Sequence, residues 1–342
     1  MLLPAFEKFI IASTNGRRLT ASGKRLTKGS VEQYKCVYKL LSEFENNHLI
    51  PIRIRLIHRS SLRELQKEKL YWKRFFREFT IFMYVKKGCY DHYVTLVYKI
   101  IKTFFNYLIN DKTLPIGNFH RQFRLPAEKI TPIVLEPHQL KFLIKNEEFH
   151  DSLPKNFQRS KDTFVFGCTV GLRVCDLMNL KKDNVQFSNS GNFISLSTVK
   201  TSTDVKIPIP DYILKIISRY EKGRSKYLLP RLSNTNLNIH IKKIIERAGW
   251  THNLIKIRHK QGKAVEQKNR KGDCYRFCDH ITSHTMRRTA ITTLLMLGVS
   301  ENIVRKISGH ASGSKEFYKY VAVAQDYLNG EVMTAFDKLL SD

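Results

Sequence analysis

The chain has 342 residues, of which 59 are Lys or Arg and 30 are Asp or Glu, so its formal net charge is +29. This length suggests two domains, and 42% hydrophobic residues is enough for ordinary globular cores. No stretch of about 18 uncharged apolar residues occurs, which excludes a membrane-spanning helix. The excess of positive charge favours a polyanionic partner, most simply nucleic acid, although a solvated basic surface or association with ribosomes would give the same balance.

The six cysteines show no repeated spacing and are predicted to be reduced thiols of a cytoplasmic protein. Cys274, Cys278, His280 and His284 allow a zinc hypothesis, but C-x3-C-x-H lacks the usual knuckle spacing and has no second cysteine pair nearby. We therefore predict no metal and no cofactor. The first residues carry a charge within a short apolar run, so no signal peptide is expected.

The N-terminal part of the chain is predicted to be helical. Helices are expected over residues 1–14, from a Ser30 cap to about Glu45, over 60–86 and over 90–111. The basic, Gly- and Ser-containing residues 15–29 are predicted to form a loop that could follow a phosphate backbone or be mobile. A proline-containing linker follows this helical region.

The C-terminal part is predicted to mix helices with a small antiparallel sheet, so the fold class is mainly α. Its elements are, in order, a helix from Pro137, an apolar helix in 162–180 broken at Gly171, strands over 183–209, helices over 211–222 and 235–248, a basic hairpin or loop over 253–280, a helix capped by Ser283 and ended by Gly298, a short helix capped by Ser300, and a last helix over about 325–340.

Residues 283–323, SHTMRRTAITTLLMLGVSENIVRKISGHASGSKEFYKYVAV, contain a concentration of reactive side chains. His284 and Arg287 share one face near a helix N-terminus, where free N–H groups favour an anion. His310 and the phenols of Tyr318 and Tyr320 follow. Imidazole, guanidinium and phenol together predict phosphoryl transfer with a phenol as nucleophile.

HTMRR, then ISGH, then a tyrosine about ten residues further on resemble the C-terminal signature of the tyrosine recombinases, or phage-type integrases. That family also has an arginine in a G-L-R box and a lysine on a β-hairpin. The matching residues are Arg173 in Gly171-Leu172-Arg173 and Lys200 in STVKTSTDVKIPIP. The resemblance covers roughly residues 130–330, and its motifs occur in the family's order, which is more specific than any one of them.

The resemblance implies a helical core-binding domain (1–115), a linker (116–134) and a mixed α/β catalytic domain (135–342), which together form a C-shaped clamp on DNA. It implies a dimer on each inverted-repeat core site in double-stranded DNA, and a tetramer that joins two sites and exchanges strands through a Holliday junction. An apolar last helix more often packs against its own domain, but the resemblance implies that it docks on a neighbouring protomer. DNA-bending accessory proteins could assist. The chain is expected to lack the arm-binding domain of many relatives, and no membrane is involved.

The resemblance also assigns roles to the basic residues. Arg173 and Arg287 would bind the non-bridging phosphate oxygens, because a guanidinium offers paired planar donors and stays charged. An ion pair for Arg173 and a surface phosphate contact for Arg287 are the alternatives. Lys200 would protonate the leaving 5′ oxygen, with Lys206 as its competitor. Arg288 faces away from Arg287 on the helix and is predicted to be structural or to contact DNA.

His284 and His310 would donate hydrogen bonds to the phosphate or shuttle protons, and Asp176 would orient its neighbours. Tyr320 is the preferred nucleophile because it precedes a β-branched residue in FYKYVAV, as in the family; Tyr318 is the second choice. Attack by the phenol would give a 3′-phosphotyrosyl bond whose religation needs no ATP.

The resemblance implies a site-specific tyrosine recombinase that integrates or excises a phage, transposon or other mobile element. A type IB topoisomerase, which uses the same chemistry, is the first alternative. A sequence-specific DNA-binding protein without catalytic activity is the second, since residues 284–310 loosely match a helix–turn–helix.

Overall fold

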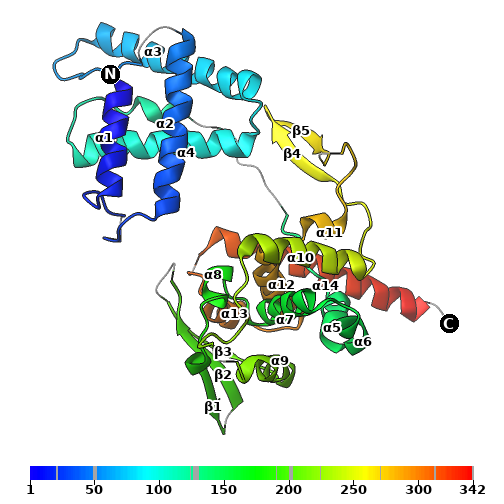
Figure 1. Cartoon of the computed structure of the whole chain (residues 1–342). Coiled ribbons are helices and arrows are strands. Elements are labelled where there is room, and N and C mark those ends of the chain that lie inside the picture. The colour runs from blue at the N-terminus through cyan, green and yellow to red at the C-terminus, as the bar shows by residue number, and fades with distance from the viewer. Residues whose placement is uncertain are drawn as a thin grey trace. The chain divides into compact units, whose positions relative to one another are not determined.

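The fold is known from a computed structural model, which describes residues 1–20, 22–48, 52–123, 125, 131–189, 191–199, 203–223, 225–269, 271–311 and 313–340 (Figure 1). Contacts divide the chain into two compact units. Unit 1 comprises Met1–Lys129 and Lys256–Gln267, and unit 2 comprises Ile130–Ile255 and Lys268–Asp342.

Unit 1 is helical, as the sequence predicted. Its helices are α1 (Leu2–Thr14), α2 (Lys28–His48), α3 (Leu62–Ile81), α4 (Asp91–Asn106), the π-helical turns η1 (Phe82–Lys86) and η2 (Tyr107–Asp111), and the 3-10 turn η3 (Phe119–Gln122). The predicted Ser30 cap is wrong, because α2 begins at Lys28. Thr27 precedes the helix, and its hydroxyl oxygen accepts from the Ser30 N–H at 3.3 Å.

The core of unit 1 is rich in aromatic rings, and several of them meet edge to face. Trp72 contacts Phe105 with ring centroids 5.0 Å apart, and Phe44 contacts Phe79 at 5.1 Å. Ile116 and Phe123, which lie in the segment predicted to be a linker, are buried in this core.

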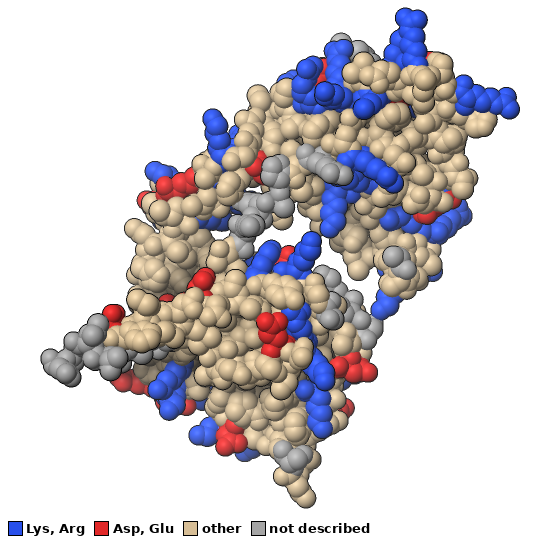
Figure 2. Space-filling view, turned by 180° about the vertical axis from the view of Figure 1, so that it is seen from behind, with Lys and Arg blue, Asp and Glu red and all other residues tan. Residues whose placement is uncertain are grey.

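The space-filling view of one face shows Lys and Arg side chains spread widely over the surface, with fewer acidic ones (Figure 2).

A two-stranded hairpin from late in the sequence also belongs to unit 1. Its antiparallel strands are β4 (Lys256–Lys260) and β5 (Lys263–Gln267). The turn between them uses positive φ angles at Gln261 (54°) and Gly262 (75°), as a two-residue hairpin turn requires. The buried Asp91 carboxylate accepts both turn N–H groups, at 2.8 and 2.9 Å, and the Tyr84 hydroxyl at 2.7 Å.

Unit 2 combines helices with one antiparallel sheet of order β1-β2-β3. Its elements are α5 (Pro137–Lys145), α6 (Glu147–Asp151), α7 (Lys155–Val170), α8 (Val174–Leu177), the 3-10 turn η4 (Lys182–Asn184), β1 (Val185–Ser188), β2 (Gly191–Ser197), β3 (Asp204–Pro208), α9 (Asp211–Glu221), α10 (Asn234–Arg247), α11 (Phe277–His280), α12 (Ser283–Met296), α13 (Glu301–Ser308) and α14 (Lys315–Leu340). The central helix α12 packs against α7, α10, α13 and α14 (Figure 1). The predicted mainly helical fold with a small antiparallel sheet is confirmed.

Two predicted helix starts in unit 2 are wrong. The cap of α12 is Thr282, whose N–H is bound by the Thr285 hydroxyl at 3.0 Å, and Ser283 is the first helical residue. The last helix begins at Lys315 instead of about residue 325. Both Tyr318 and Tyr320 therefore lie in its first two turns.

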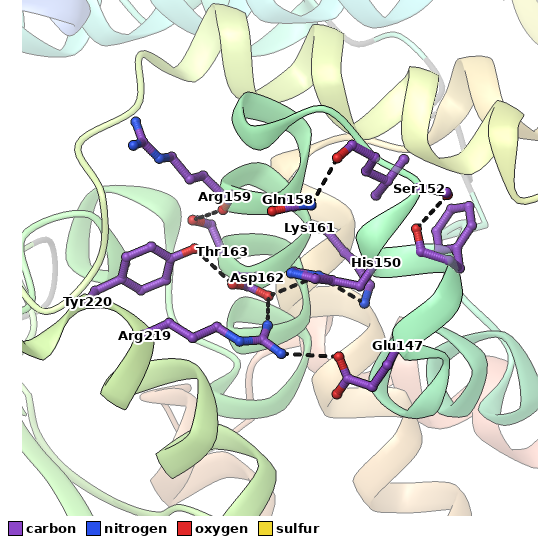
Figure 3. Close-up of polar contacts among 12 residues, drawn as sticks. Glu147, His150, Ser152, Gln158, Arg159, Lys161, Asp162, Thr163, Arg219 and Tyr220 are labelled. Carbon is purple, nitrogen blue, oxygen red and sulfur yellow. Dashed lines mark hydrogen bonds and ion pairs between the residues drawn. The ribbon is translucent and has the colours of Figure 1, made fainter.

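A buried polar network ties α6, α7 and α9 together (Figure 3). Asp162 of α7 is 2% exposed and accepts from Arg219 and from the Tyr220 hydroxyl, each at 2.8 Å. Arg219 also pairs with Glu147 at 3.2 Å. Burial and the neighbouring Asp162 carboxylate raise the pKa of Tyr220, so its proton stays in the hydrogen bond. The network fixes α7 upstream of Gly171.

Among the helices of the described ranges, none combines the length and the apolar composition that a bilayer crossing requires.

Candidate active site

The site begins at the turn that ends α7. Gly171 adopts a left-handed conformation with φ of 65°, and its carbonyl oxygen accepts from Nη1 of the buried Arg287 at 2.9 Å. A Cβ at Gly171 would lie 3.2 Å from the Cβ of Ala290 on α12, so the turn and α12 are closely packed. Arg173 follows as the N-cap residue of α8. The G-L-R box and the H-x-x-R helix are therefore in direct contact.

Two guanidinium groups interact through their charges in this site. Arg287 is 4% exposed, and burial followed by the nearby Arg173 cation lowers the pKa of Arg287 to about 10. It still carries its charge at neutral pH. Nη1 of Arg173 is buried and has no hydrogen-bond partner among the described residues. Two cations held this close favour an anion between them.

His310 lies directly against Arg287. Its Nδ1 is 2.8 Å from the Ser308 hydroxyl, which is 2.6 Å from the carbonyl oxygen of Val304. Arg287 Nη2 lies 3.3 Å from both ring nitrogens of His310. Since the hydroxyl proton is used on the Val304 carbonyl, the network assigns the His310 proton to Nδ1 and leaves Nε2 as the ring nitrogen that can accept. Burial, then the Arg287 and Arg173 cations, lowers the pKa of His310 to about 4. The imidazole is therefore neutral at neutral pH.

The two candidate tyrosines differ sharply in environment. Tyr320 is 6% exposed, packs in a small core with Ile291, Val304 and Phe317, and has its ring centroid 6.0 Å from that of His310. Its charge interaction with Arg287 is favourable, since it raises the pKa of that guanidinium. Tyr318 is 53% exposed and lies beside Arg305. Of the two phenols, Tyr320 is the one packed against the His310–Arg287 pair.

Asp176 connects α8 to the β2–β3 hairpin. The carboxylate is 2% exposed, and Oδ1 accepts from the backbone N–H of Val199 at 2.9 Å. The adjacent Lys200 lies outside the described residues. Its competitor Lys206, on β3, has Nζ 4.2 Å from the ring centroid of Phe193. The structure thus gives Asp176 a definite contact at the base of the hairpin loop.

His284 occupies the first turn of α12, one turn before Arg287, and is exposed. Within the ranges that the structure describes, no group of three or more His, Cys, Asp or Glu side chains could hold a metal ion. His280, from the zinc hypothesis, has Nε2 2.9 Å from the carbonyl oxygen of Leu254 instead.

Beside His310 lies a cavity of about 610 Å³ between β3 and α13. Its lining includes the basic side chains of Lys206, Arg305 and Lys306. Arg305 and Ser308 were not predicted as site residues, although Ser308 belongs to the ISGH motif and Arg305 lies two residues before it. In the sequence they are visible as a cationic residue five positions before His310 and a hydroxyl residue two positions before it.

The sequence model of the phage integrase family matches residues 134–326. The chain belongs to this family of tyrosine recombinases. The resemblance noted in the HTMRR, ISGH and G-L-R motifs is confirmed, and these motifs all lie within the matched range.

Two archaeal relatives illustrate the family. The chain is 26% identical to tyrosine recombinase XerA of Thermococcus onnurineus, over 58% of this chain and 64% of that protein. It is 25% identical to tyrosine recombinase XerA of Pyrococcus furiosus, over 66% of this chain and 68% of that protein. The chain therefore spans about two thirds of the length of these recombinases.

Solved recombinase structures share the fold. The Tn1549 transposon integrase, in complex with circular intermediate DNA, superimposes with a TM-score of 0.56 at 15% identity, over 93% of this chain and 94% of that one. The XerH site-specific recombinase, bound to its palindromic difH substrate, gives 0.57 at 14% identity, over 89% of this chain and 79% of that one. At such identities the likeness concerns the fold alone.

Proposed function

We propose that the protein is a site-specific recombinase that cuts and rejoins double-stranded DNA through a 3′-phosphotyrosyl intermediate. The observation that carries the proposal is the buried Tyr320 beside the His310–Arg287 pair, in a site where Arg173 Nη1 has no partner among the described residues. A phenol, an imidazole and two guanidiniums around one point suit a phosphodiester better than an uncharged substrate.

The two arginines would stabilise the transition state. Attack on a phosphodiester concentrates negative charge on the non-bridging oxygens, so fixed cations already in place lower the barrier. Arg287 is held by Gly171 before substrate arrives, so its orientation does not have to be created during the reaction. Arg173 would supply the second fork. His310, neutral and fixed by Ser308, would complete the set of polar groups around the phosphate.

Tyr320 would be the nucleophile. Its phenol oxygen forms a bond to phosphorus as the bond from phosphorus to the 5′ oxygen breaks, and the phenol proton passes to solvent water. The 5′ oxygen leaves as a hydroxyl after it takes up a proton, for which Lys200 is the proposed donor. One phosphodiester is exchanged for another, so the reverse attack by a 5′ hydroxyl reseals DNA without a nucleotide cofactor.

The wider biological role is inferred from what the similar proteins of known structure bind. One is a transposon integrase in complex with circular intermediate DNA, and another, the lambda integrase, was solved as a tetramer bound to a Holliday junction. We propose integration or excision of a mobile element, by dimers on inverted core sites that pair into a tetramer, in the cytoplasm. Residues 1–115 would bind the core site, 116–134 would link the domains, and 135–342 would catalyse.

The test is covalent capture on nicked DNA. The full chain would be incubated with a pool of duplexes that carry a nick between randomised arms, so that a cleaved strand end is lost and the intermediate accumulates. Protein-linked DNA is recovered under denaturing conditions and sequenced. We expect a covalent product with a common sequence, which Tyr320→Phe abolishes and Tyr318→Phe preserves.

The alternatives give different results. Loss with Tyr318→Phe alone would keep the chemistry and move the nucleophile. Relaxation of supercoiled plasmid without sequence preference would indicate a type IB topoisomerase. Tight, salt-sensitive enrichment of one sequence without any covalent product would indicate a DNA-binding protein that lacks the cleavage activity.

A further inference from the structure

Arg305 lies between the two segments that carry His310 and Tyr320. It belongs to α13 and is 9% exposed. Its guanidinium carbon is 3.8 Å from the ring centroid of Phe317 and 5.0 Å from that of Tyr318. Both rings belong to the first turn of α14, two or three residues from Tyr320. A planar cation over a ring face is an attractive, directional contact.

The same side chain also fixes the connection from α13 to α14. Nη1 donates to the carbonyl oxygen of Ala311 at 3.4 Å, and Nη2 donates to Glu301 at 3.2 Å. The backbone carbonyl oxygen of Arg305 accepts from the His310 N–H at 3.0 Å. One residue therefore contacts the start of α13, the backbone on both sides of His310, and the start of α14.

Phe317 transmits this contact to the site. It is fully buried, and its ring meets His310 with centroids 5.4 Å apart and Tyr320 at 6.5 Å, both close to edge to face. Any rotation of Phe317 would therefore move the packing surface of both rings.

We propose that Arg305 is a positioning residue that holds the first turn of α14 so that Tyr320 points at the phosphate site. This rests on the proposed function, because it assigns Tyr320 as nucleophile. The requirement is for a flat guanidinium, since an ammonium cannot cover a ring face and bond Ala311 and Glu301 at once. Arg305 itself would not touch the reacting atoms.

The experiment compares Arg305→Lys and Arg305→Gln with the unmodified chain. Arg305→Lys keeps the positive charge but loses the planar guanidinium, and Arg305→Gln loses both the charge and the guanidinium. Lys319→Gln is the control, because Lys319 is a cation on α14, the helix that carries Tyr320, and it pairs at the surface with Glu316. The rate of covalent capture is measured on a nicked duplex at saturating protein, and DNA affinity is measured separately.

We expect both Arg305 variants to lose about ten- to a hundredfold in capture rate, as misplacement of a reacting group does. DNA affinity should change little, and the control should keep its rate. A second measurement follows position directly: 3-fluorotyrosine is placed at residue 320 and its fluorine resonance is recorded without DNA. Both Arg305 variants should shift or broaden this resonance, and Lys319→Gln should not.

Three results would overturn the proposal. The first is an unchanged fluorine resonance in both Arg305 variants, and the second is wild-type capture by Arg305→Lys, which would mean that charge alone matters. The third is a loss of DNA affinity that accounts for the rate, which would make Arg305 a DNA contact. Absence of covalent product from the unmodified chain would instead refute the proposed function, and the fluorine measurement would still report on Arg305.

Discussion

Arg287 donates to the carbonyl oxygen of Gly171 through Nη1 and to His310 through Nη2, at 2.9 and 3.3 Å. One buried guanidinium therefore joins the end of α7 to the segment after α13. Arg287 thus has both a structural hydrogen bond and a candidate catalytic position. Arg173 has only the candidate catalytic position, because its buried Nη1 lacks a partner among the described residues.

The two arginines should therefore separate stability from cleavage. Arg287→Gln leaves the buried Gly171 carbonyl without its donor, so the free energy of unfolding should fall by about 1–3 kcal/mol. Arg173→Gln should leave that free energy nearly unchanged and reduce covalent capture by about 10²–10³-fold. Urea unfolding and the capture assay measure the two effects. A strong loss of stability in Arg173→Gln, with Arg287→Gln unaffected, would reverse this assignment.

His310 should titrate far below an ordinary histidine. In the DNA-free protein we expect its imidazole to protonate near a pKa of about 4, against about 6.5 in the unfolded chain. Between these two pKa values the unfolded chain binds the His310 proton more readily than the folded protein does. The stability that the neutral imidazole contributes is therefore complete above about pH 6.5, and it is lost as the pH falls toward about 4. NMR titration of the ring protons measures this.

The Arg287→Gln variant supplies the control for that titration. Removal of the Arg287 cation, the largest cause after burial, should raise the pKa of His310. A His310 that titrates near 6.5 in the unmodified protein would contradict its burial between cations.

The buried Asp162 network should stabilise unit 2. Asp162→Ala removes the acceptor of Arg219 and Tyr220 and the carboxylate whose charge offsets that of the buried Lys161. We therefore expect a loss of about 3–5 kcal/mol in the free energy of unfolding. Asp183→Ala, at an exposed position, is the matched control and should stay within about 0.5 kcal/mol. Equal midpoints for the two variants in urea would show that the network contributes little.

Asp91 should hold the hairpin turn. Asp91→Ala removes the acceptor of the Gln261 and Gly262 amides, so both should exchange with solvent faster by a factor of ten or more, which corresponds to about 1.4 kcal/mol of local opening. Tyr84→Phe removes only a donor to the same carboxylate and should have a smaller effect. Amide exchange followed by mass spectrometry measures both. Unchanged protection in Asp91→Ala would mean that the turn is held by its own strands.

The sequence was most informative where short spacings decide the structure. Gly171 ends α7 because only glycine adopts a left-handed turn easily, and the i, i+3 spacing of His284 and Arg287 places both near the start of α12. The meeting of the G-L-R box with this helix required the family pattern, because the two segments are more than a hundred residues apart.

The start of α14 was missed although its signal was present. Phe317, Tyr320 and Ala324 are all buried, at the i, i+3, i+7 spacing of a helix face. The prediction placed the two tyrosines by the family motif alone and gave no weight to this helical spacing.

Other contacts leave no local pattern. The tie from Asp176 to Val199, the pairing of Asp162 with Arg219 and the stacking of Arg305 on Phe317 each depend on a tertiary neighbour that no spacing specifies. The membership of the 256–267 hairpin in unit 1 is similar, because an alternating basic hairpin could pack anywhere. The sequence therefore predicted most of the elements, and the structure supplied the contacts that hold the candidate site residues.

The hairpin of unit 1 affects when this unit can be assembled during synthesis of the chain. Asp91 meets Gln261 across 170 residues of sequence, so the ribosome must synthesise most of unit 2 before unit 1 has all of its parts. The N-terminal helices would emerge first, with the Asp91 carboxylate still in water. Contacts at such separation slow folding, and nascent domains generally fold in N-to-C order. Final assembly of the N-terminal unit would thus be a late step that waits for the synthesis of the strands that complete it.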